Sequence, residues 1–129
     1  HKNTMAHTNP VKEKKVLIIE DEGDICLLMN IMLNEKGIRL DHVKSLAAAK
    51  TFLQEETPEL VLLDNKLPDG FGVDFIPLIK SQYPSVKIGM VSGFSASVKD
   101  VALENGADFF LEKPFTKDQL HTSVMEVLN

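Results

Sequence analysis

The sequence predicts an α/β fold, a single doubly wound domain in which a five-stranded parallel sheet is flanked by five helices. Three observations support this class. Strand-like and helix-like segments alternate along most of the chain, as parallel sheets with right-handed crossovers require. The apolar runs VLII and LVLL are only four residues long, which is typical of strands covered on both faces. The length of 129 residues fits one domain rather than two.

A polar segment precedes the first strand. Residues 1–14 show no apolar period, so we interpret them as a flexible leader ahead of a domain that spans residues 15–129. His1 to Thr4 precede the first methionine, Met5, and are compatible with an expression remnant. His1 and His7 therefore receive no role in a site.

Five segments are interpreted as strands, each followed by a helical pattern of apolar residues. The strands are Lys15–Ile19, Arg39–Val43, Leu60–Leu63, Lys87–Val91 and Asp108–Leu111. The first helix ends before Gly37, which lies where a C-terminal glycine cap is expected. Ser45 can cap the second helix, which ends before Pro58. Thr116 and Gln119 have the spacing of a capping box at the start of the fifth helix.

The third and fourth helices have less regular signals. The third lies near Val73–Gln82 and contains Pro77. Unless Pro77 lies in the first turn, it deletes a backbone hydrogen bond and predicts a kink. The fourth helix starts at Ser95 or Ser97 and ends near Asn105-Gly106.

Carboxylates follow two of the apolar strands. Glu20 and Asp21 follow VLII, and Asp64 follows LVLL. Such groups lie at the carboxyl edge of a parallel sheet, where open α/β folds usually bind ligands. If the two strands are neighbours, the carboxylates repel one another by about 4 kcal/mol per close pair at an effective dielectric of about 20. A cation or a shared proton is then required, and a hard divalent ion such as Mg2+ suits oxygen ligands best.

Composition excludes several other classes. With 14 basic and 19 acidic residues, the formal charge is -5, so no basic surplus is available for nonspecific nucleic-acid binding. No apolar stretch approaches the ~20 residues that span a bilayer, and no signal peptide is recognisable. The single Cys26 excludes an internal disulfide and is expected in the core. We therefore expect a cytoplasmic protein without a direct nucleic-acid or membrane partner.

Four motifs occur in a recognisable order. VLIIEDE carries the acidic pair, LVLLDNKLPDGFG carries the third carboxylate, GMVSG ends a strand in a hydroxyl and a small residue, and GADFFLEKPF ends in Lys-Pro-Phe. In order and spacing they resemble the receiver domain of two-component response regulators, over essentially all of residues 15–129. The resemblance implies a flavodoxin-like fold of the receiver type and a place in phosphorelay signal transduction.

The resemblance implies a role for each carboxylate. Asp64 would accept a phosphoryl group from the phosphohistidine of a sensor histidine kinase or a histidine phosphotransfer protein. Asp21 would bind Mg2+ directly, Glu20 directly or through water, and Asp64 and the backbone carbonyl of Lys66 would complete the protein ligands. A carboxylate is a weak nucleophile, but in-line attack needs little covalent assistance once charge is neutralised and geometry is fixed.

Other residues would complete the site. In the resemblance, Lys113 pairs with Asp64 and later with a phosphoryl oxygen, Ser92 donates its hydroxyl to another phosphoryl oxygen, and Gly93 keeps the approach open. The Lys113-Pro114 peptide bond is expected to be cis, which aims the lysine into the pocket.

The output would follow from the roughly -1.5 to -2 charge that phosphorylation adds. In the resemblance, Ser92 shifts toward the phosphoryl group and Phe110 turns inward, which changes the face formed by the fourth helix, fifth strand and fifth helix. That face would bind a downstream protein or an output domain, or form a phosphorylation-dependent dimer. The sequence does not choose between a stand-alone regulator and a receiver cut from a longer protein.

Three site positions depart from the family pattern. Glu20 replaces the more usual Asp, Ser92 replaces Thr, and Phe110 replaces the common Tyr. Because Phe110 has no hydroxyl group to donate, its switching can depend only on packing. Lys66 and Phe94 each lie two residues beyond a site residue. We hypothesise that both set the dephosphorylation rate by controlling the attacking water; the alternative is that Lys66 only balances an acidic surface.

Simpler explanations apply to other polar residues: helix capping for Glu22 and Asp24, turn formation for Asp69-Gly70, and surface or satisfied side chains for His42 and His121.

Two rival functions stay open. A phosphatase of the haloacid dehalogenase type also uses an aspartate nucleophile after an apolar strand, but it needs a second Asp two residues on, where this chain has Lys66. A receiver-like scaffold would bind partners without phosphorylation. We do not expect an enzyme in the usual sense, although the domain would promote its own phosphorylation and slow dephosphorylation.

Overall fold

The computed structural model describes residues 12–93 and 96–129. A five-stranded parallel sheet has the strand order β2-β1-β3-β6-β7. Its strands are β1 (Lys14–Ile19), β2 (Ile38–Val43), β3 (Leu60–Asp64), β6 (Lys87–Ser92) and β7 (Phe109–Glu112). All five predicted strands are present, and their ends differ from the prediction by no more than one residue.

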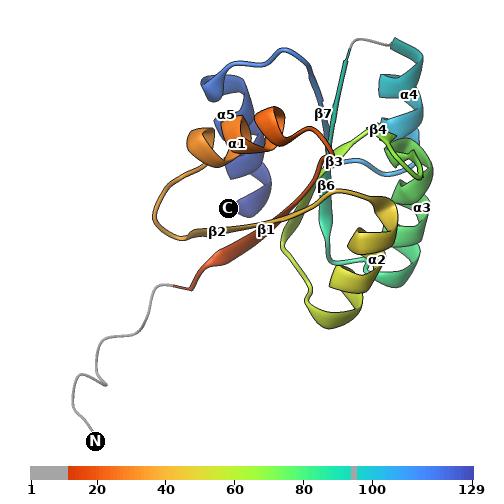
Figure 1. The fold of residues 1–129 in the computed structure, drawn as a ribbon, viewed down its shortest axis with the longest axis horizontal. Coiled ribbons are helices and arrows are strands. Elements are labelled where there is room, and N and C mark those ends of the chain that lie inside the picture. Colours follow the sequence, from red (N-terminus) through yellow and green to blue (C-terminus); the bar gives the residue numbers. More distant parts are fainter. Residues whose placement is uncertain (1–11, 94–95) are drawn as a thin grey trace, which may run out of the picture.

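Helices cover both faces of this sheet (Figure 1). One face carries α1 (Gly23–Met32) and α5 (Lys117–Leu128), and the other carries α2 (Leu46–Glu55), α3 (Gly72–Gln82) and α4 (Ala96–Glu104). Within the described residues, no helix has both the length and the apolar character needed to cross a bilayer.

Alternate residues of each central strand enter opposite cores. In β1, Val16 and Ile18 pack with α1 and α5, whereas Leu17 and Ile19 pack with α2 and α3. All four are 0% exposed, because successive side chains of a strand point to opposite faces and both faces are covered. The doubly wound α/β class is therefore confirmed.

A two-stranded hairpin that the sequence pattern does not predict lies between β3 and α3. Its strands, β4 (Lys66–Leu67) and β5 (Gly70–Phe71), pair antiparallel. Strands of two residues are too short to show a hydrophobic period. The hairpin follows Asp64 directly and therefore forms part of the same sheet edge.

Two predicted N-terminal caps are confirmed. The Ser45 hydroxyl accepts a hydrogen bond from the Ala48 amide at 3.1 Å at the start of α2. Thr116 and Gln119 make both hydrogen bonds of a capping box at the start of α5. These caps involve residues three positions apart, so a local sequence signal suffices to find them.

Other boundary predictions are wrong. Gly37 does not cap α1, which ends earlier; its φ of +92° serves the turn before β2. Glu22 occupies the N-cap position of α1, but its side chain makes no capping hydrogen bond. Because α4 already includes Ala96, Ser97 is not its N-cap, and the alternative, Ser95, lies outside the described residues.

Pro77 lies inside α3 and beyond its first turn. Proline has no amide hydrogen, so it cannot donate to the Val73 carbonyl four residues earlier. The side-chain amide of Asn105, just after α4, donates to that carbonyl at 3.1 Å. The contact between α3 and α4 thus satisfies the group that Pro77 leaves free. The kink at Pro77 stays a prediction.

Candidate functional site

The carboxyl ends of β1 and β3 meet where the strand order reverses. From β1 the chain passes first to β2 on one side and then to β3 on the other. Ligands of open α/β sheets bind at such a switch point. Glu20 and Asp21 follow β1 and Asp64 ends β3, and one carboxylate oxygen from each lies within 4.8 Å of the others. The three predicted acidic residues therefore form one cluster.

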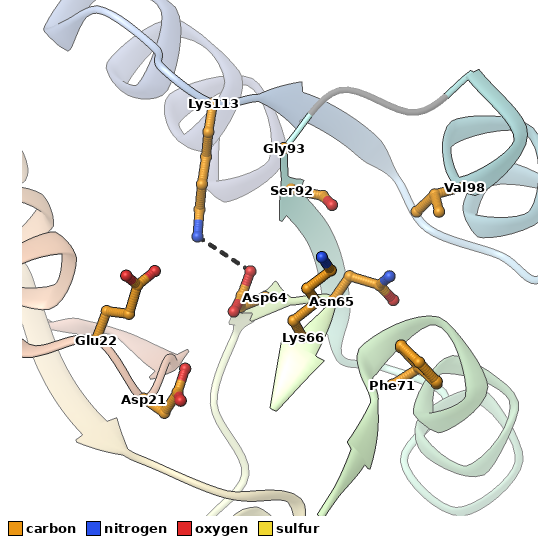
Figure 2. Close-up of a pocket in the computed structure, with 10 residues that line it drawn as sticks. All are labelled: Asp21, Glu22, Asp64, Asn65, Lys66, Phe71, Ser92, Gly93, Val98 and Lys113. Carbon is orange, nitrogen blue, oxygen red and sulfur yellow. Dashed lines mark hydrogen bonds and ion pairs between the residues drawn. The ribbon is translucent and has the colours of Figure 1, made fainter. Parts of the chain in front are cut away.

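Lys113 enters this cluster from the end of β7. Its Nζ atom lies 3.0 Å from Glu20 Oε1 and 3.0 Å from Asp64 Oδ1. Figure 2 shows the side chain extending toward Asp64, with the ion pair drawn as a dashed line. The Lys113-Pro114 peptide bond is cis, the isomer that the family resemblance implies.

The carboxylates of the cluster differ in exposure. Glu20 is 1% exposed and Asp64 is 6% exposed, whereas Asp21 lies open to solvent. Burial raises the pKa of Glu20 above its ordinary value, although hydrogen bonds from Lys113 and from the Glu22 amide oppose the shift. An ionised Glu20 is therefore costly to the folded protein unless positive charge is near.

One lysine is not enough to balance the cluster. Burial by itself would lower the pKa of Lys113, but the hydrogen bonds to Glu20 and Asp64 outweigh it and hold that pKa above the ordinary value. Lys113 is thus firmly charged. The carboxyl groups of Glu20, Asp21 and Asp64 outnumber the single ammonium that is paired with them, so the formal charge of this cluster is negative.

An open pocket of about 780 Å³ lies over Asp64. Asp21 and Glu22 line one side, and Phe71 and Val98 line the opposite side (Figure 2). The other lining residues are Asp64, Asn65, Lys66, Ser92, Gly93 and Lys113. A small charged group can therefore reach Asp64 from solvent between an acidic wall and an apolar wall.

The donor set fits a hard divalent cation. All side-chain donors of the cluster are carboxylate oxygens, they carry excess negative charge, and Asp21 keeps one side accessible. Mg2+ prefers oxygen ligands and usually binds one or two carboxylates while keeping several waters. Glu20, Asp21 and Asp64 are the residues that would hold it.

The remaining predicted residues lie around this cluster. Ser92 is the last residue of β6, next to β3, and is 7% exposed. A Cβ atom placed on Gly93 would meet nothing within 4 Å, so the space beside Gly93 is open. Lys66 is exposed in β4, and Phe110 in β7 is partly buried against the core beneath α2, α3 and α4. Phe94 lies outside the described residues.

Asn65 also belongs to the site, and sequence reasoning missed it. It is 6% exposed and lines the pocket. Its backbone carbonyl accepts a hydrogen bond from the Gly72 amide at 2.7 Å, and its side-chain oxygen accepts one from the Val73 amide at 3.0 Å. A Cβ atom on Gly72 would collide with the Asp64 carbonyl oxygen. The start of α3 is therefore packed directly on Asp64, and the only sequence signal was the position of Asn65 beside that residue.

The two internal histidines have partners of their own. His42 Nε2 lies 2.7 Å from the Glu20 carbonyl oxygen, and His121 Nε2 lies 2.6 Å from Glu35 Oε1. Neither belongs to the described residues that line the pocket. Cys26 is buried in the core, as predicted, and burial raises the pKa of its thiol.

Comparisons with known proteins agree with this fold. A family model described as the response regulator receiver domain matches residues 16–125. The KDP operon transcriptional regulatory protein KdpE of Escherichia coli is 34% identical over 114 residues, which cover 88% of this chain and 50% of KdpE. The response regulator protein PilR of Pseudomonas aeruginosa is 31% identical over 119 residues, which cover 92% of this chain and 27% of PilR.

A solved structure is also similar. The receiver domain of NtrX from Brucella abortus aligns with a TM-score of 0.82 at 29% identity, covering 88% of this chain and 97% of that one. The chain thus spans half of KdpE and about a quarter of PilR, but nearly all of an isolated receiver domain.

Proposed function

The chain belongs to the response regulator receiver domain family, and from this premise we propose that Asp64 accepts a phosphoryl group from a phosphohistidine. The observation that carries the proposal is the convergence of Asp64 with two other carboxylates and Lys113 at the floor of an open pocket. Perturbed ionisable groups in a cleft are typical of functional sites.

In the proposed reaction, a carboxylate oxygen of Asp64 attacks phosphorus in line with the phosphorus–nitrogen bond of the donor. That bond breaks, an acyl phosphate forms, and the imidazole leaves with the electron pair and takes up a proton. Lys113 then pairs with a phosphoryl oxygen instead of with Asp64, and Ser92 donates its hydroxyl to another. Mg2+ held by Glu20, Asp21, Asp64 and the Lys66 carbonyl would supply charge neutralisation and orientation.

The partners follow from this role. The phosphoryl donor is a sensor histidine kinase or a histidine phosphotransfer protein in the cytoplasm. The phosphoryl group carries roughly -1.5 to -2 charge in place of the single charge of the Asp64 carboxylate, and it adds acceptor oxygens at the end of β3; this favours the conformation in which Ser92 and Phe110 move toward the site. This changes the face of α4, β7 and α5, which binds a downstream protein or an output domain or forms a dimer. The domain is a switch with slow self-dephosphorylation rather than a turnover enzyme.

The first test is phosphorylation by a small phosphodonor with Mg2+, followed by intact-protein mass spectrometry. The wild type should gain one phosphoryl group, and Asp64→Asn should gain none, because its amide cannot form the acyl phosphate. Asp24→Asn, which changes an acidic residue in the first turn of α1, is the matched control and should behave as the wild type. Phosphorylation of Asp64→Asn would refute the proposal.

Beryllofluoride with Mg2+ separates the switch from a phosphorylation-independent scaffold. As a phosphoryl mimic it should shift the backbone NMR signals of residues 64, 92 and 113 and of the α4, β7 and α5 face. A protein that shows no shift would instead be a scaffold.

We also propose that Lys66 and Phe94 control the lifetime of the acyl phosphate. Lys66 is exposed and lines the pocket, so its side chain can influence the water that attacks the phosphoryl group. The lifetimes of Lys66→Ala and Phe94→Ala should differ from that of the wild type, whereas Lys50→Ala on α2 should leave the lifetime unchanged. Unchanged lifetimes in the first two variants would remove the idea.

A further inference from the structure

Hydrogen bonds to neighbouring helices hold the hairpin of β4 and β5 at both its base and its tip. At its base, Asn65 accepts hydrogen bonds from the first two amides of α3 at 2.7 and 3.0 Å. At its tip, Asp69 contacts the start of α2. Lys66, whose carbonyl the proposed function assigns to Mg2+, lies between these two anchors.

The anchor at the tip is a bidentate contact. Asp69 Oδ1 accepts from the Leu46 amide and Oδ2 accepts from the Ala47 amide, each at 2.9 Å. These amides belong to the first turn of α2 and have no partner within that helix. The two hydrogen bonds hold the pKa of Asp69 below its ordinary value. A carboxylate is the favoured partner at this position, because the positive end of the helix dipole lies there.

The backbone also packs closely at this tip. Gly70 has a φ of +152°, and a Cβ atom on it would lie 3.0 Å from Leu46 Cδ1. The hairpin tip and the start of α2 are therefore held by charge, by hydrogen bonds and by close contact, although they are 22 and 23 residues apart in the chain.

Such a short hairpin needs external support. Each strand has two residues, with Lys66 paired to Phe71 and Leu67 paired to Gly70. An isolated two-stranded hairpin is at best marginally stable, even when its strands are longer. Ser45 already caps α2 through the Ala48 amide. The contact with Asp69 thus does more than complete a helix cap, because it joins α2 to the segment next to Asp64.

We propose that Asp69 is a positioning residue of the acceptor site: by anchoring the hairpin tip to α2, it fixes the Lys66 carbonyl relative to Asp64 and thereby supports Mg2+ binding. The inference rests on the proposed function and adds α2 to the structure that supports the site. Residues that orient metal ligands from outside commonly change metal affinity when they are replaced.

The test is the Mg2+ dissociation constant, measured by isothermal titration calorimetry. Asp69→Asn keeps the size of the side chain but loses the charge and one acceptor, and it should weaken Mg2+ binding about tenfold, the lower end of the loss for such outer residues. Ser45→Ala is the matched control, because it removes the other side-chain cap of α2 without touching the hairpin. It should lower the melting temperature but leave the dissociation constant unchanged.

Gly70→Ala provides a second variant that keeps the carboxylate. Its added methyl group meets Leu46 and strains the backbone, so it should displace the tip and weaken Mg2+ binding in the same direction. Unchanged Mg2+ affinity in Asp69→Asn, or an equal loss in Ser45→Ala, would overturn the positioning role. Failure of the wild type to be phosphorylated would instead overturn the proposed function, so the two failures are distinguishable.

Discussion

The two edges of the parallel sheet both carry charged side chains, but they match those charges differently. At the amino edge opposite charges meet in pairs. Lys15 Nζ lies 3.5 Å from Glu56 Oε1, and Lys80 Nζ lies 3.5 Å from Asp108 Oδ2. These side chains are between 26% and 39% exposed, so water screens them. Each such pair is worth at most about 1 kcal/mol.

At the carboxyl edge the charges are unequal and enclosed. Among the described residues, Lys113 is the one cation paired with Glu20 and Asp64, an oxygen of Asp21 lies close by, and the Glu20 side chain is 1% exposed. Excess buried charge of one sign costs the folded state stability unless another cation arrives. The comparison indicates that partly exposed ion pairs contribute only to the stability of the fold. An excess of buried charge of one sign instead marks a site that binds a cation.

The largest predicted effect on the free energy of unfolding comes from replacing one paired lysine at each edge. Lys113→Met leaves Glu20 and Asp64 without a counter-ion and should cost about 3 kcal/mol, the lower end of the loss when one partner of a buried ion pair is removed. Lys80→Met at the amino edge should cost at most about 1 kcal/mol. Urea unfolding in the presence of a chelator measures both. Equal losses would break the distinction between the two edges.

The next effect is stabilisation by Mg2+ itself. A ligand that binds only the folded state at about 100 times its dissociation constant adds about 2.7 kcal/mol. The wild type and Lys80→Met should both gain stability to this extent when Mg2+ replaces a chelator. Asp21→Asn, which removes an exposed carboxylate from the cluster, should gain much less. Thermal unfolding with and without Mg2+ provides the measurement, and a full gain in Asp21→Asn would show that the cation binds elsewhere.

The gathering of carboxylates at the carboxyl edge could largely be predicted from the sequence. The runs VLII and LVLL form most of β1 and most of β3, and the apolar residues of both strands are almost fully buried. Because both strands are parallel and adjacent, the carboxylates at their ends, Glu20 and Asp21 after β1 and Asp64 in the last position of β3, had to meet at one edge. A regular period and a regular order of elements were sufficient for this prediction.

The hydrogen bonds that support the site could not be predicted from the sequence, because they join residues that are distant in the chain. Asn65 and Asp69 stand in the motif LVLLDNKLPDGFG, but nothing local shows that Asn65 accepts from the start of α3 or that Asp69 accepts from the start of α2. The error at Gly37 has a related cause. A glycine with positive φ serves either a helix end or a turn, and the sequence does not distinguish the two.

The smallest predicted effect concerns the glutamates of the two edges. Burial raises the pKa of Glu20, so its ionised form costs the folded protein stability as the pH rises above the unfolded value of about 4.3. Glu20→Gln keeps an acceptor for Lys113 and removes that cost. In the presence of a chelator at pH 7, this variant should therefore be slightly more stable than the wild type. The difference should shrink as the pH falls toward 4, because Glu20 then becomes increasingly protonated in the unfolded state as well.

Glu56→Gln is the matched change at the amino edge, where Glu56 lies near Lys15 and Arg39 at 3.5 and 3.8 Å. Here the carboxylate is paired and partly exposed, so the variant should lose a few tenths of a kcal/mol to about 1 kcal/mol at pH 7. The two substitutions remove the same charge but should change the free energy of unfolding in opposite directions, since Glu56 faces two cations, whereas Glu20 lies among other carboxyl groups. Chelator-treated urea titrations at pH 4 and pH 7 would sharpen the comparison. A loss of stability at pH 7 in both variants would mean that Lys113 already balances the acidic cluster.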